Sequence, residues 1–354
     1  MSIKNIIKIS VFLSIYGICA AQFEGNSCVL SDASGPGKCV KAQNCDYAKR
    51  LIQMRQNPQL CGFRRRTALV CCPISSNFTN KSRSEEKCQE YHHIRNVRPV
   101  IAFGEKAKSR EFPHMAAVGY GDDKKDVLWA CGGSLISDQF VLTAAHCTRT
   151  RDYGDPKWVR LGELNLNDTT EDADPQDFDV EAVFVHPDYK PPSHYNDVAL
   201  LKLKKTVLFN LYIKPACVHT EEKLPNSLIQ AIGWGKTDFF GDSSSHLLKV
   251  YLTIIKHKTC SKSYSNISER KLAKGIEDKS QICAGDASGK DTCPGDSGGP
   301  LQFWQSSSGE LLDHFVVIGI TSFGKACGIE NSAGVYTRVS FFRSWIEDTV
   351  WPIS

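Results

Sequence analysis

Short apolar segments separated by turn-forming residues recur from residue 101 to the C-terminus. The clearest are residues 114–119, 133–135, 140–142, 198–203 and 316–320. Glycine and proline punctuate the sequence between them at intervals of about ten residues. Such spacing is typical of strands in an all-β sandwich or barrel, whereas parallel βαβ units need long helical segments between strands. We therefore expect a mainly β domain over residues 101–354.

The spacing of apolar positions changes near the C-terminus. Side chains four residues apart form two rows there, which are Phe341, Trp345 and Thr349, and Phe342, Ile346 and Val350. Residues four apart share one face of an α-helix. The pattern predicts one C-terminal helix that packs against the core of the β domain.

Six cysteines crowd the segment 28–72, which is too short to bury a sufficient core. They are Cys28, Cys39, Cys45, Cys61, Cys71 and Cys72. A module of this size needs disulfides in place of a core. Six cysteines allow fifteen pairings, and spacing alone does not choose among them. The adjacent Cys71 and Cys72 point to opposite sides of an extended chain, so we expect them to bridge to different places.

The segment 73–100 between these modules is polar, with runs of Ser, Asn, Lys, Arg and Glu. No helical or strand periodicity persists along it, which predicts an exposed linker open to proteolysis. The expected organisation is a targeting segment at 1–21, a disulfide-rich module at 28–72, the linker at 73–100 and the β domain at 101–354.

The N-terminus predicts secretion. Lys4 and Lys8 precede and interrupt an apolar run that reaches Ile18, and the small residues Ala20 and Ala21 follow. This pattern is typical of a secretory signal peptide. A membrane anchor is the alternative, but the run is short for a span of about 20 residues. Fifteen cysteines also indicate an oxidising compartment, so we expect an extracellular protein without a membrane span.

Composition and charge narrow the class further. With 41% apolar and 23% charged residues, the chain is neither collagen-like, nor a coiled coil, nor mainly disordered. Its net charge of +4 does not by itself indicate nucleic acid binding. Residues 22–100 carry 13 Lys and Arg against 6 Asp and Glu, and residues 101–354 carry 28 against 33, which suggests two modules with different surfaces. The densest basic cluster, Arg64 to Arg66, is either a solvated face or a docking point for an anionic partner.

Three short segments carry candidate chemistry. They are Leu-Thr-Ala-Ala-His146-Cys147, Asn196-Asp197-Val198 and Gly295-Asp-Ser297-Gly-Gly-Pro300. Each alone has an ordinary structural explanation, namely a core histidine, a turn aspartate and a tight loop. Together, in the order His, Asp, Ser within one β domain, they indicate nucleophilic catalysis by a serine.

On these segments the β domain resembles the trypsin-like serine proteases, and the six-cysteine module resembles the clip domain that precedes them in arthropods. The whole chain is thus similar to an arthropod clip-domain serine protease zymogen. The resemblance implies a chymotrypsin-like double Greek-key β-barrel with a C-terminal helix and an active site between the two barrels. It also implies that Ser297 attacks the scissile carbonyl, His146 is the general base, Asp197 orients His146, and the N–H groups of Gly295 and Ser297 bind the oxyanion.

The resemblance further implies a specificity pocket for arginine or lysine. Asp291, six residues before Ser297, is expected at its base, and Gly324 and Gly334 along its walls. Ser322 and Phe323 are expected to bind substrate backbone. Two residues depart from the usual pattern, which are Phe323, where the family usually has Trp, and Pro294 before Gly295.

Seven disulfides follow from the same resemblance. In the clip segment they are Cys28–Cys71, Cys39–Cys61 and Cys45–Cys72. In the protease they are Cys131–Cys147, Cys260–Cys283 and Cys293–Cys327, with Cys88–Cys217 joining the linker to the protease.

Family register also places the activation cleavage between Val100 and Ile101, after which the new ammonium group of Ile101 would pair with Asp296. Val100 replaces the usual Arg or Lys at that bond, and the nearest upstream cation, Arg98, precedes Pro99. We therefore expect an activating protease of non-tryptic specificity.

Catalysis by this triad needs no cofactor. The acidic loop containing Glu163, Asn165 and Asp168 has oxygen ligands dense enough for Ca²⁺, although a solvated loop is the simpler interpretation. Four sequons, at Asn77, Asn80, Asn167 and Asn266, are candidate glycosylation sites in a secreted chain.

The sequence therefore predicts an endopeptidase in an extracellular cascade of immunity, melanisation or patterning. The resemblance implies a protein substrate, such as a downstream zymogen or a cytokine precursor, and a serpin inhibitor, with no nucleic acid or membrane partner. A non-catalytic clip-domain homologue and a digestive or venom protease remain as alternatives.

Overall fold

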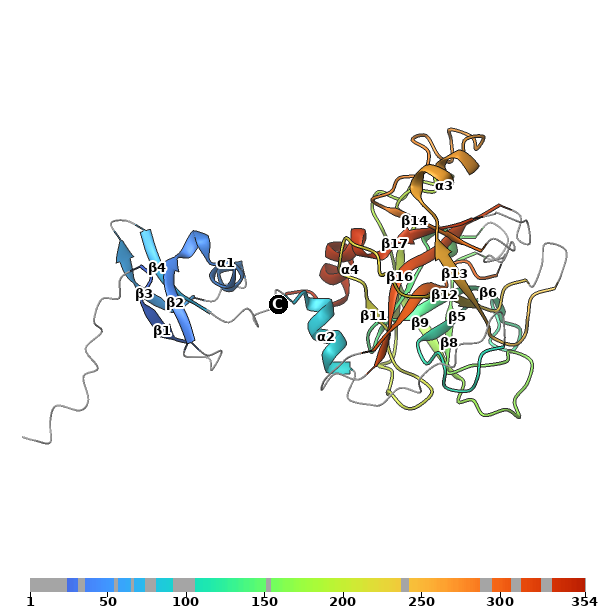
Figure 1. Cartoon of the computed structure of the whole chain (residues 1–354). Coiled ribbons are helices and arrows are strands. Elements are labelled where there is room, and N and C mark those ends of the chain that lie inside the picture. Colours follow the sequence, from blue (N-terminus) through green and yellow to red (C-terminus); the bar gives the residue numbers. More distant parts are fainter. Residues whose placement is uncertain are drawn as a thin grey trace, which may run out of the picture. The chain divides into compact units, whose positions relative to one another are not determined.

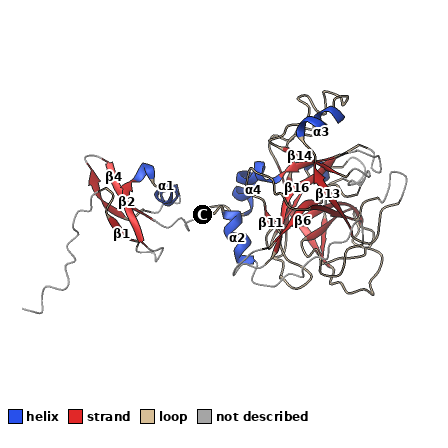
Figure 2. Cartoon of the chain, viewed as in Figure 1, coloured by secondary structure: helices blue, strands red, loops and turns tan. Residues whose placement is uncertain are grey.

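The computed structural model divides the chain into two compact units, Met1–Lys81 and Ser82–Pro352, and strands dominate both (Figures 1 and 2). It describes residues 24–30, 36–53, 57–64, 67–73, 81–91, 106–150, 154–236, 242–286, 295–306, 313–325 and 333–353. Among these residues no helix is long and apolar enough to cross a membrane.

The first unit is a four-stranded antiparallel sheet with one short helix. Its elements are β1 (Ser27–Val29), β2 (Pro36–Lys41), a 3₁₀ turn (Ala42–Asn44), α1 (Asp46–Gln53), β3 (Leu60–Arg64) and β4 (Thr67–Pro73). The strand order is β1-β2-β4-β3. Few large apolar side chains are buried here, and cysteines make up much of the two small cores.

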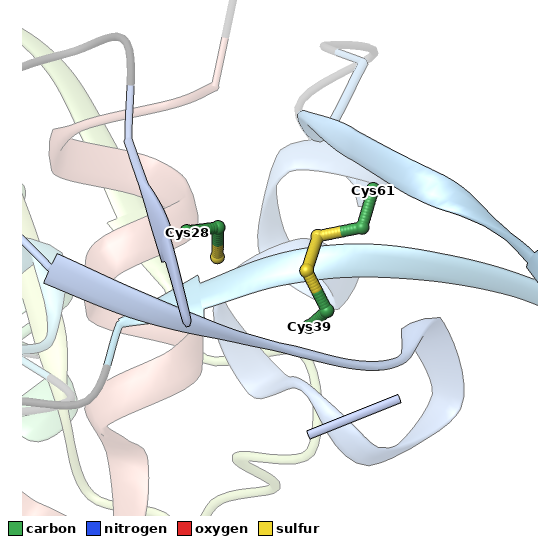
Figure 3. A group of neighbouring side chains, drawn as sticks. All are labelled: Cys28, Cys39 and Cys61. Carbon is green, nitrogen blue, oxygen red and sulfur yellow. A yellow bond between two sulfur atoms is a disulfide. The ribbon is translucent and has the colours of Figure 1, made fainter. Parts of the chain in front are cut away.

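Three disulfides hold this sheet together, and all three match the predicted pairs. They are Cys28–Cys71, Cys39–Cys61 and Cys45–Cys72. Because side chains alternate along β4, its neighbouring cysteines reach different partners, as expected. The sulfurs of Cys28, Cys39 and Cys61 lie close together (Figure 3). All of them are oxidised in disulfides, so they do not form a thiolate metal site.

The second unit begins with a closed six-stranded antiparallel barrel. Its strands are β5 (Met115–Tyr120), β6 (Leu128–Leu135), β7 (Phe140–Thr143), β8 (Trp158–Leu161), β9 (Gln176–Val185) and β10 (Ala199–Leu203). They close in the order β10-β7-β6-β5-β8-β9. Every residue of β5 and β7 is buried, which agrees with the apolar runs in the sequence.

A second barrel follows it along the chain. Its strands are β12 (Ile229–Gly233), β13 (Leu248–Ile254), β14 (Gln281–Gly285), β15 (Pro300–Gln305), β16 (His314–Phe323) and β17 (Gly334–Arg338), with α3 (His257–Ser263) between β13 and β14. The pairing of β16 with β17 closes the six strands, and β11 (Cys217–Val218) adds to β16 in parallel. The predicted pair of six-stranded barrels is thereby confirmed.

The predicted C-terminal helix is α4 (Arg343–Val350), preceded by a 3₁₀ turn (Val339–Phe342). One of the two predicted rows is fully buried, and the other reaches the core only through the half-buried Trp345. Phe342, Ile346 and Val350 are buried, whereas Phe341 of the other row is 52% exposed. The buried row is the centre of the apolar stripe by which the helix packs on the barrel, and Trp345 lies at its edge.

The linker contains a helix that the sequence pattern did not predict. This helix, α2 (Arg83–Tyr91), belongs to the protease unit. Ser82 and Glu85 form a reciprocal capping box at its start, with the Ser82 N–H donating to Glu85 Oε2 at 2.7 Å. The sequence pattern predicted neither helix nor strand in the linker 73–100, and this is wrong for residues 83–91.

Contacts with the protease core hold α2 in place. Its Ser84 hydroxyl donates to Glu347 of α4 at 2.7 Å, and Arg83 pairs with Asp348. The predicted disulfide between Cys88 and Cys217 joins α2 to β11. A cleavage between α2 and residue 101 therefore leaves the clip unit covalently attached to the protease.

Candidate active site

His146 lies on a single 3₁₀ turn, Ala145–Thr148, directly after β7. Two contacts of the next residue fix this turn against the first barrel. Cys147 forms a disulfide with Cys131 of β6, and its carbonyl oxygen accepts a hydrogen bond of 2.6 Å from the Tyr120 hydroxyl. The imidazole thus projects from a segment that is braced on two sides.

Asp197 is buried two residues before β10, with 1% of its surface exposed. The Nδ1–H of His146 donates to its Oδ2 at 2.8 Å, and the His146 backbone N–H donates to its Oδ1 at 2.9 Å. Ser322 also donates its hydroxyl to Oδ2. Because Nδ1 is held by Asp197, the other ring nitrogen of His146, Nε2, is the one available to accept a proton.

This environment sets the charge of both groups. Burial alone would raise the pKa of Asp197, but the charge and hydrogen bonds of His146, together with the Ser322 hydroxyl, hold it below its usual value. Burial would likewise lower the pKa of His146, but the charge and hydrogen bond of Asp197 raise it above its usual value. The pair therefore combines an ionised carboxylate with an imidazole of increased basicity.

Ser297 lies in a tight loop between two glycines with positive φ, Gly295 at 102° and Gly298 at 79°. The second needs glycine for space as well, because a Cβ there would lie 2.2 Å from Thr143 Oγ1. The Gly132 N–H donates to the Ser297 carbonyl oxygen at 2.7 Å, and that oxygen also lies 3.6 Å from Cys147 Sγ. The loop is thereby held beside the turn that carries His146.

Asp296, next to Ser297, inserts its carboxylate between Gly233 and Gly235. The Gly235 N–H donates to its Oδ1 at 2.8 Å, and a Cβ on Gly233 would lie 2.0 Å from that oxygen. Glycine is therefore required at both positions. Its expected partner, Ile101, lies outside the described residues, as does Val100.

Residues expected to bind substrate lie along β16 and β17. Ser322 and Phe323 end β16, and Gly334 begins β17. Gly324 follows Phe323 directly. Asp291 and Pro294 lie outside the described residues, so their places in the pocket stay predictions.

Two aromatic neighbours of Phe323 had not been predicted. The His194 ring stacks on Phe323 with centroids 4.1 Å apart and an interplanar angle of 18°. Tyr264 meets the same ring edge-on at 5.6 Å. Burial lowers the pKa of His194 to about 4, so this ring is neutral at physiological pH. No sequence motif marks His194, because its contact depends on how the loop before Asp197 folds onto the second barrel.

Hydrogen-bond donors of the protein bind the carboxylates of the acidic loop. Glu163 pairs with Arg160 at 3.2 Å, and its other oxygen accepts the N–H groups of Leu164 and Asn165. Asp168 accepts the Thr170 N–H at 2.8 Å. Among the described residues, each cluster of potential metal ligands contains disulfide-bonded cysteines. Calcium binding by this loop stays a prediction.

The remaining predicted disulfides and sequons lie partly inside and partly outside the described residues. Cys260–Cys283 is present as predicted. Cys293–Cys327 lies outside the described residues. The sequons at Asn167 and Asn266 are exposed, and those at Asn77 and Asn80 lie outside the described part of the chain.

Comparisons with known proteins agree with this geometry. The family model described as Trypsin matches residues 101–346. "Serine protease snk" of Drosophila melanogaster is 36% identical over 92% of this chain and 78% of its own length. "CLIP domain-containing serine protease B4" of Anopheles gambiae is 34% identical over 92% of both chains. "Phenoloxidase-activating factor 1" of Holotrichia diomphalia is 32% identical over 89% of this chain and 91% of its own. The chain belongs to the clip-domain serine proteases of insects, within the trypsin family.

Proposed function

We propose that this chain is the zymogen of a secreted endopeptidase that cleaves after arginine or lysine in an extracellular cascade. The observation that carries the proposal is the His146–Asp197 pair, braced beside the loop of Ser297. Within the described residues no protein acceptor takes the N–H groups of Gly295 and Ser297, which supports their use as oxyanion donors.

The proposed mechanism follows from these positions. Ser297 Oγ attacks the scissile carbonyl carbon while His146 Nε2 takes the hydroxyl proton. The N–H groups of Gly295 and Ser297 stabilise the resulting oxyanion. His146 then gives the proton to the leaving amine as the C–N bond breaks. A water molecule repeats the sequence on the acyl-enzyme and releases the new carboxylate.

The activity of the mature enzyme is expected to rise with pH through a midpoint above the ordinary histidine pKa of about 6.5. His146 accepts a proton only when it is neutral, and Asp197 raises the pKa of His146. Protonation of His146 therefore inactivates the enzyme below that midpoint. The midpoint is measured from the pH dependence of kcat/KM with a short arginine amide. The rate of fluorophosphonate labelling of Ser297 should show the same pH dependence. A midpoint below 6.5 would contradict the role of His146 as general base.

Specificity for arginine and lysine is attributed to Asp291, with Gly324 and Gly334 leaving room for a long side chain. The Asp291→Ser variant is expected to lose kcat/KM on arginine amides by roughly 10³-fold, because the substrate cation would be buried without a partner. Replacing residues 97–100 with an enteropeptidase recognition sequence provides activated enzyme for this assay without the natural activator.

Asp278→Ser is the matched control, since Asp278 is exposed on the same barrel and should leave the rate unchanged. A wild-type enzyme that prefers aromatic residues would refute the specificity. Failure of fluorophosphonate to label the activated chain at Ser297 would favour a non-catalytic homologue instead.

The place in a cascade rests on the relatives and on the linker. One relative's name describes a phenoloxidase-activating factor, which supports a protein substrate such as a downstream zymogen or a cytokine precursor. A serpin is the corresponding class of inhibitor. Secretion follows from the N-terminal signal pattern.

We infer that a non-tryptic protease activates the zymogen at the Val100–Ile101 bond. Asp296 is held between Gly233 and Gly235, next to Ser297, where a new ammonium group would organise the oxyanion donors. An ammonium group beside this half-buried carboxylate would stabilise its ionised form. Cleavage after Arg95 would leave five extra residues before Ile101, too many for the amino group to reach Asp296 in register.

Elastase is therefore expected to activate the zymogen and trypsin is not. The measurement is amidolysis after each treatment, with N-terminal sequencing of the products. Activity that coincides with a new N-terminus at Ile101 supports the inference. Full activity after trypsin, with a start at Asn96, would overturn it.

A further inference from the structure

A strongly basic segment separates β13 from β14. Residues 256–274 carry six Lys and Arg against one Glu. The rest of residues 101–354 carries 22 against 32, so this segment reverses the local charge of an otherwise acidic domain. We call it the basic loop. It contains α3, which lies beside β14 at the end of the second barrel (Figure 1).

The cations of the basic loop are available to a partner. All six are exposed, namely Lys256, Lys258, Lys262, Arg270, Lys271 and Lys274. Within the described part of the chain only Lys274 forms an ion pair, at 3.6 Å from Glu277. Unpaired charges on one loop add their potentials, and such a surface attracts anionic groups over about 10 Å at moderate salt.

The backbone beneath these charges is firmly held. Cys260 of α3 is bonded to Cys283 of β14, and Leu272 packs in the same small core. The Tyr195 hydroxyl donates to the Gly275 carbonyl oxygen at 2.7 Å and accepts the Lys274 N–H at 2.8 Å. Because the backbone of the loop is already fixed, binding a partner would have to order only its side chains.

The basic loop also borders the substrate-binding strand. The His194 N–H donates to the Lys271 carbonyl oxygen at 3.0 Å, and the His194 ring stacks on Phe323. Lys325 places its ammonium 5.6 Å from the centre of the Tyr264 ring, which itself contacts Phe323. Lys271 and Lys325 are therefore each one residue removed from contact with Phe323, through His194 and Tyr264 respectively.

We propose that the basic loop is a docking surface for an acidic segment of the protein substrate. That segment would lie a few residues before the cleaved bond, where substrate backbone runs along Ser322 and Phe323, with Arg270 and Lys271 as its main contacts. The proposal rests on the proposed function and adds a substrate class to it. An acidic partner would be repelled by most of the domain and attracted beside the cleft, which would orient it for cleavage.

The test compares two peptides that share a scissile arginine and differ in three residues placed third to fifth before it. One has Asp and Glu there and the other has Asn and Gln. With the activated full chain, kcat/KM for the acidic peptide is expected to be roughly tenfold higher at about 20 mM salt and less than about twofold higher at 0.5 M. The R270Q/K271Q variant should lose this preference.

Two controls separate docking from folding and from catalysis. The K204Q/K205Q variant removes the same charge from exposed positions just after β10, at its end away from Asp197, and should keep the preference. A short arginine amide that does not reach the basic loop reports the catalytic centre alone, and all three enzymes should cleave it at similar rates.

Equal cleavage of both peptides, with the short amide still cleaved, overturns the docking proposal and leaves the proposed function intact. A preference that persists in R270Q/K271Q also overturns it. If instead only retention on heparin depends on Arg270 and Lys271, the surface binds polyanionic glycans and the substrate assignment is wrong. Failure of all enzymes on the short amide would refute the proposed function itself.

Discussion

The Asp197→Asn variant is expected to lower kcat by roughly 10⁴-fold at neutral pH. An amide nitrogen facing His146 would donate to Nδ1 and force the ring into the tautomer that carries its proton on Nε2. That nitrogen could then no longer accept the proton of Ser297. KM for a short arginine amide should change little, because the specificity pocket does not involve this carboxylate. The measurement is steady-state amidolysis by the activated chain.

The matched control is Asp177→Asn, which changes an exposed carboxylate that pairs with Arg160 on the first barrel. Its kcat should stay within about twofold of wild type, since exposed pairs contribute little. With its Nδ2 in the place of Oδ2, the Asn side chain at position 197 can donate to the Ser322 hydroxyl oxygen, and its Oδ1 can still accept the His146 backbone N–H, so the thermal midpoint of the variant should stay near that of wild type. A variant that is folded and retains a tenth of the activity would contradict the role assigned to Asp197.

The largest expected effect on stability comes from a buried ion pair that includes no residue of the triad. Lys249 Nζ lies 2.7 Å from Glu111 Oε1, and the two side chains are 1% and 3% exposed. Replacing Lys249 with Met leaves the carboxylate buried without its cation. The expected loss in unfolding free energy is about 3–5 kcal/mol. Urea unfolding of the full-length chain with Ser297→Ala, which prevents self-digestion, measures it.

A double variant separates pairing from packing. Glu111→Leu combined with Lys249→Met should recover most of the loss, because well-packed apolar residues replace buried ion pairs at little cost. Lys202→Met, which breaks a partly exposed pair with Glu181, should change the unfolding free energy by about 0.5 kcal/mol or less. If Lys249→Met were no more costly than this control, the buried pair would not be a stabilising element.

The sequence predicted those elements whose local residue pattern has the same physical cause as their place in the fold. Buried strands such as β5 and β7 read as apolar runs because both faces are covered. The disulfide pairs came from family resemblance rather than from spacing. Helix α2 was missed because few of its residues are apolar, and packing against α4 and β11 supplies its stability. Its one local signal, the capping box from Ser82 to Glu85, lies in a stretch that otherwise looks like linker.

Contacts between distant segments were the hardest to predict at the site. Ser322 was expected to bind substrate backbone, yet its hydroxyl donates to Asp197 across 125 positions of sequence. His194 and Tyr264 reach Phe323 only because two loops fold toward the same strand end. Neither residue type nor spacing predicts these contacts with Phe323, so the aromatic residues around the cleft could be identified only from the structure.

The disulfide between α2 and β11 sets the concentration of the clip unit around the protease after activation. A released clip unit would be diluted into the surrounding fluid as soon as the activating bond is cut. Held by Cys88 and Cys217, it stays on the same molecule, at an effective concentration on the order of millimolar for a short connection. Any partner that binds the clip unit would therefore keep the protease localised with it, however dilute the enzyme becomes.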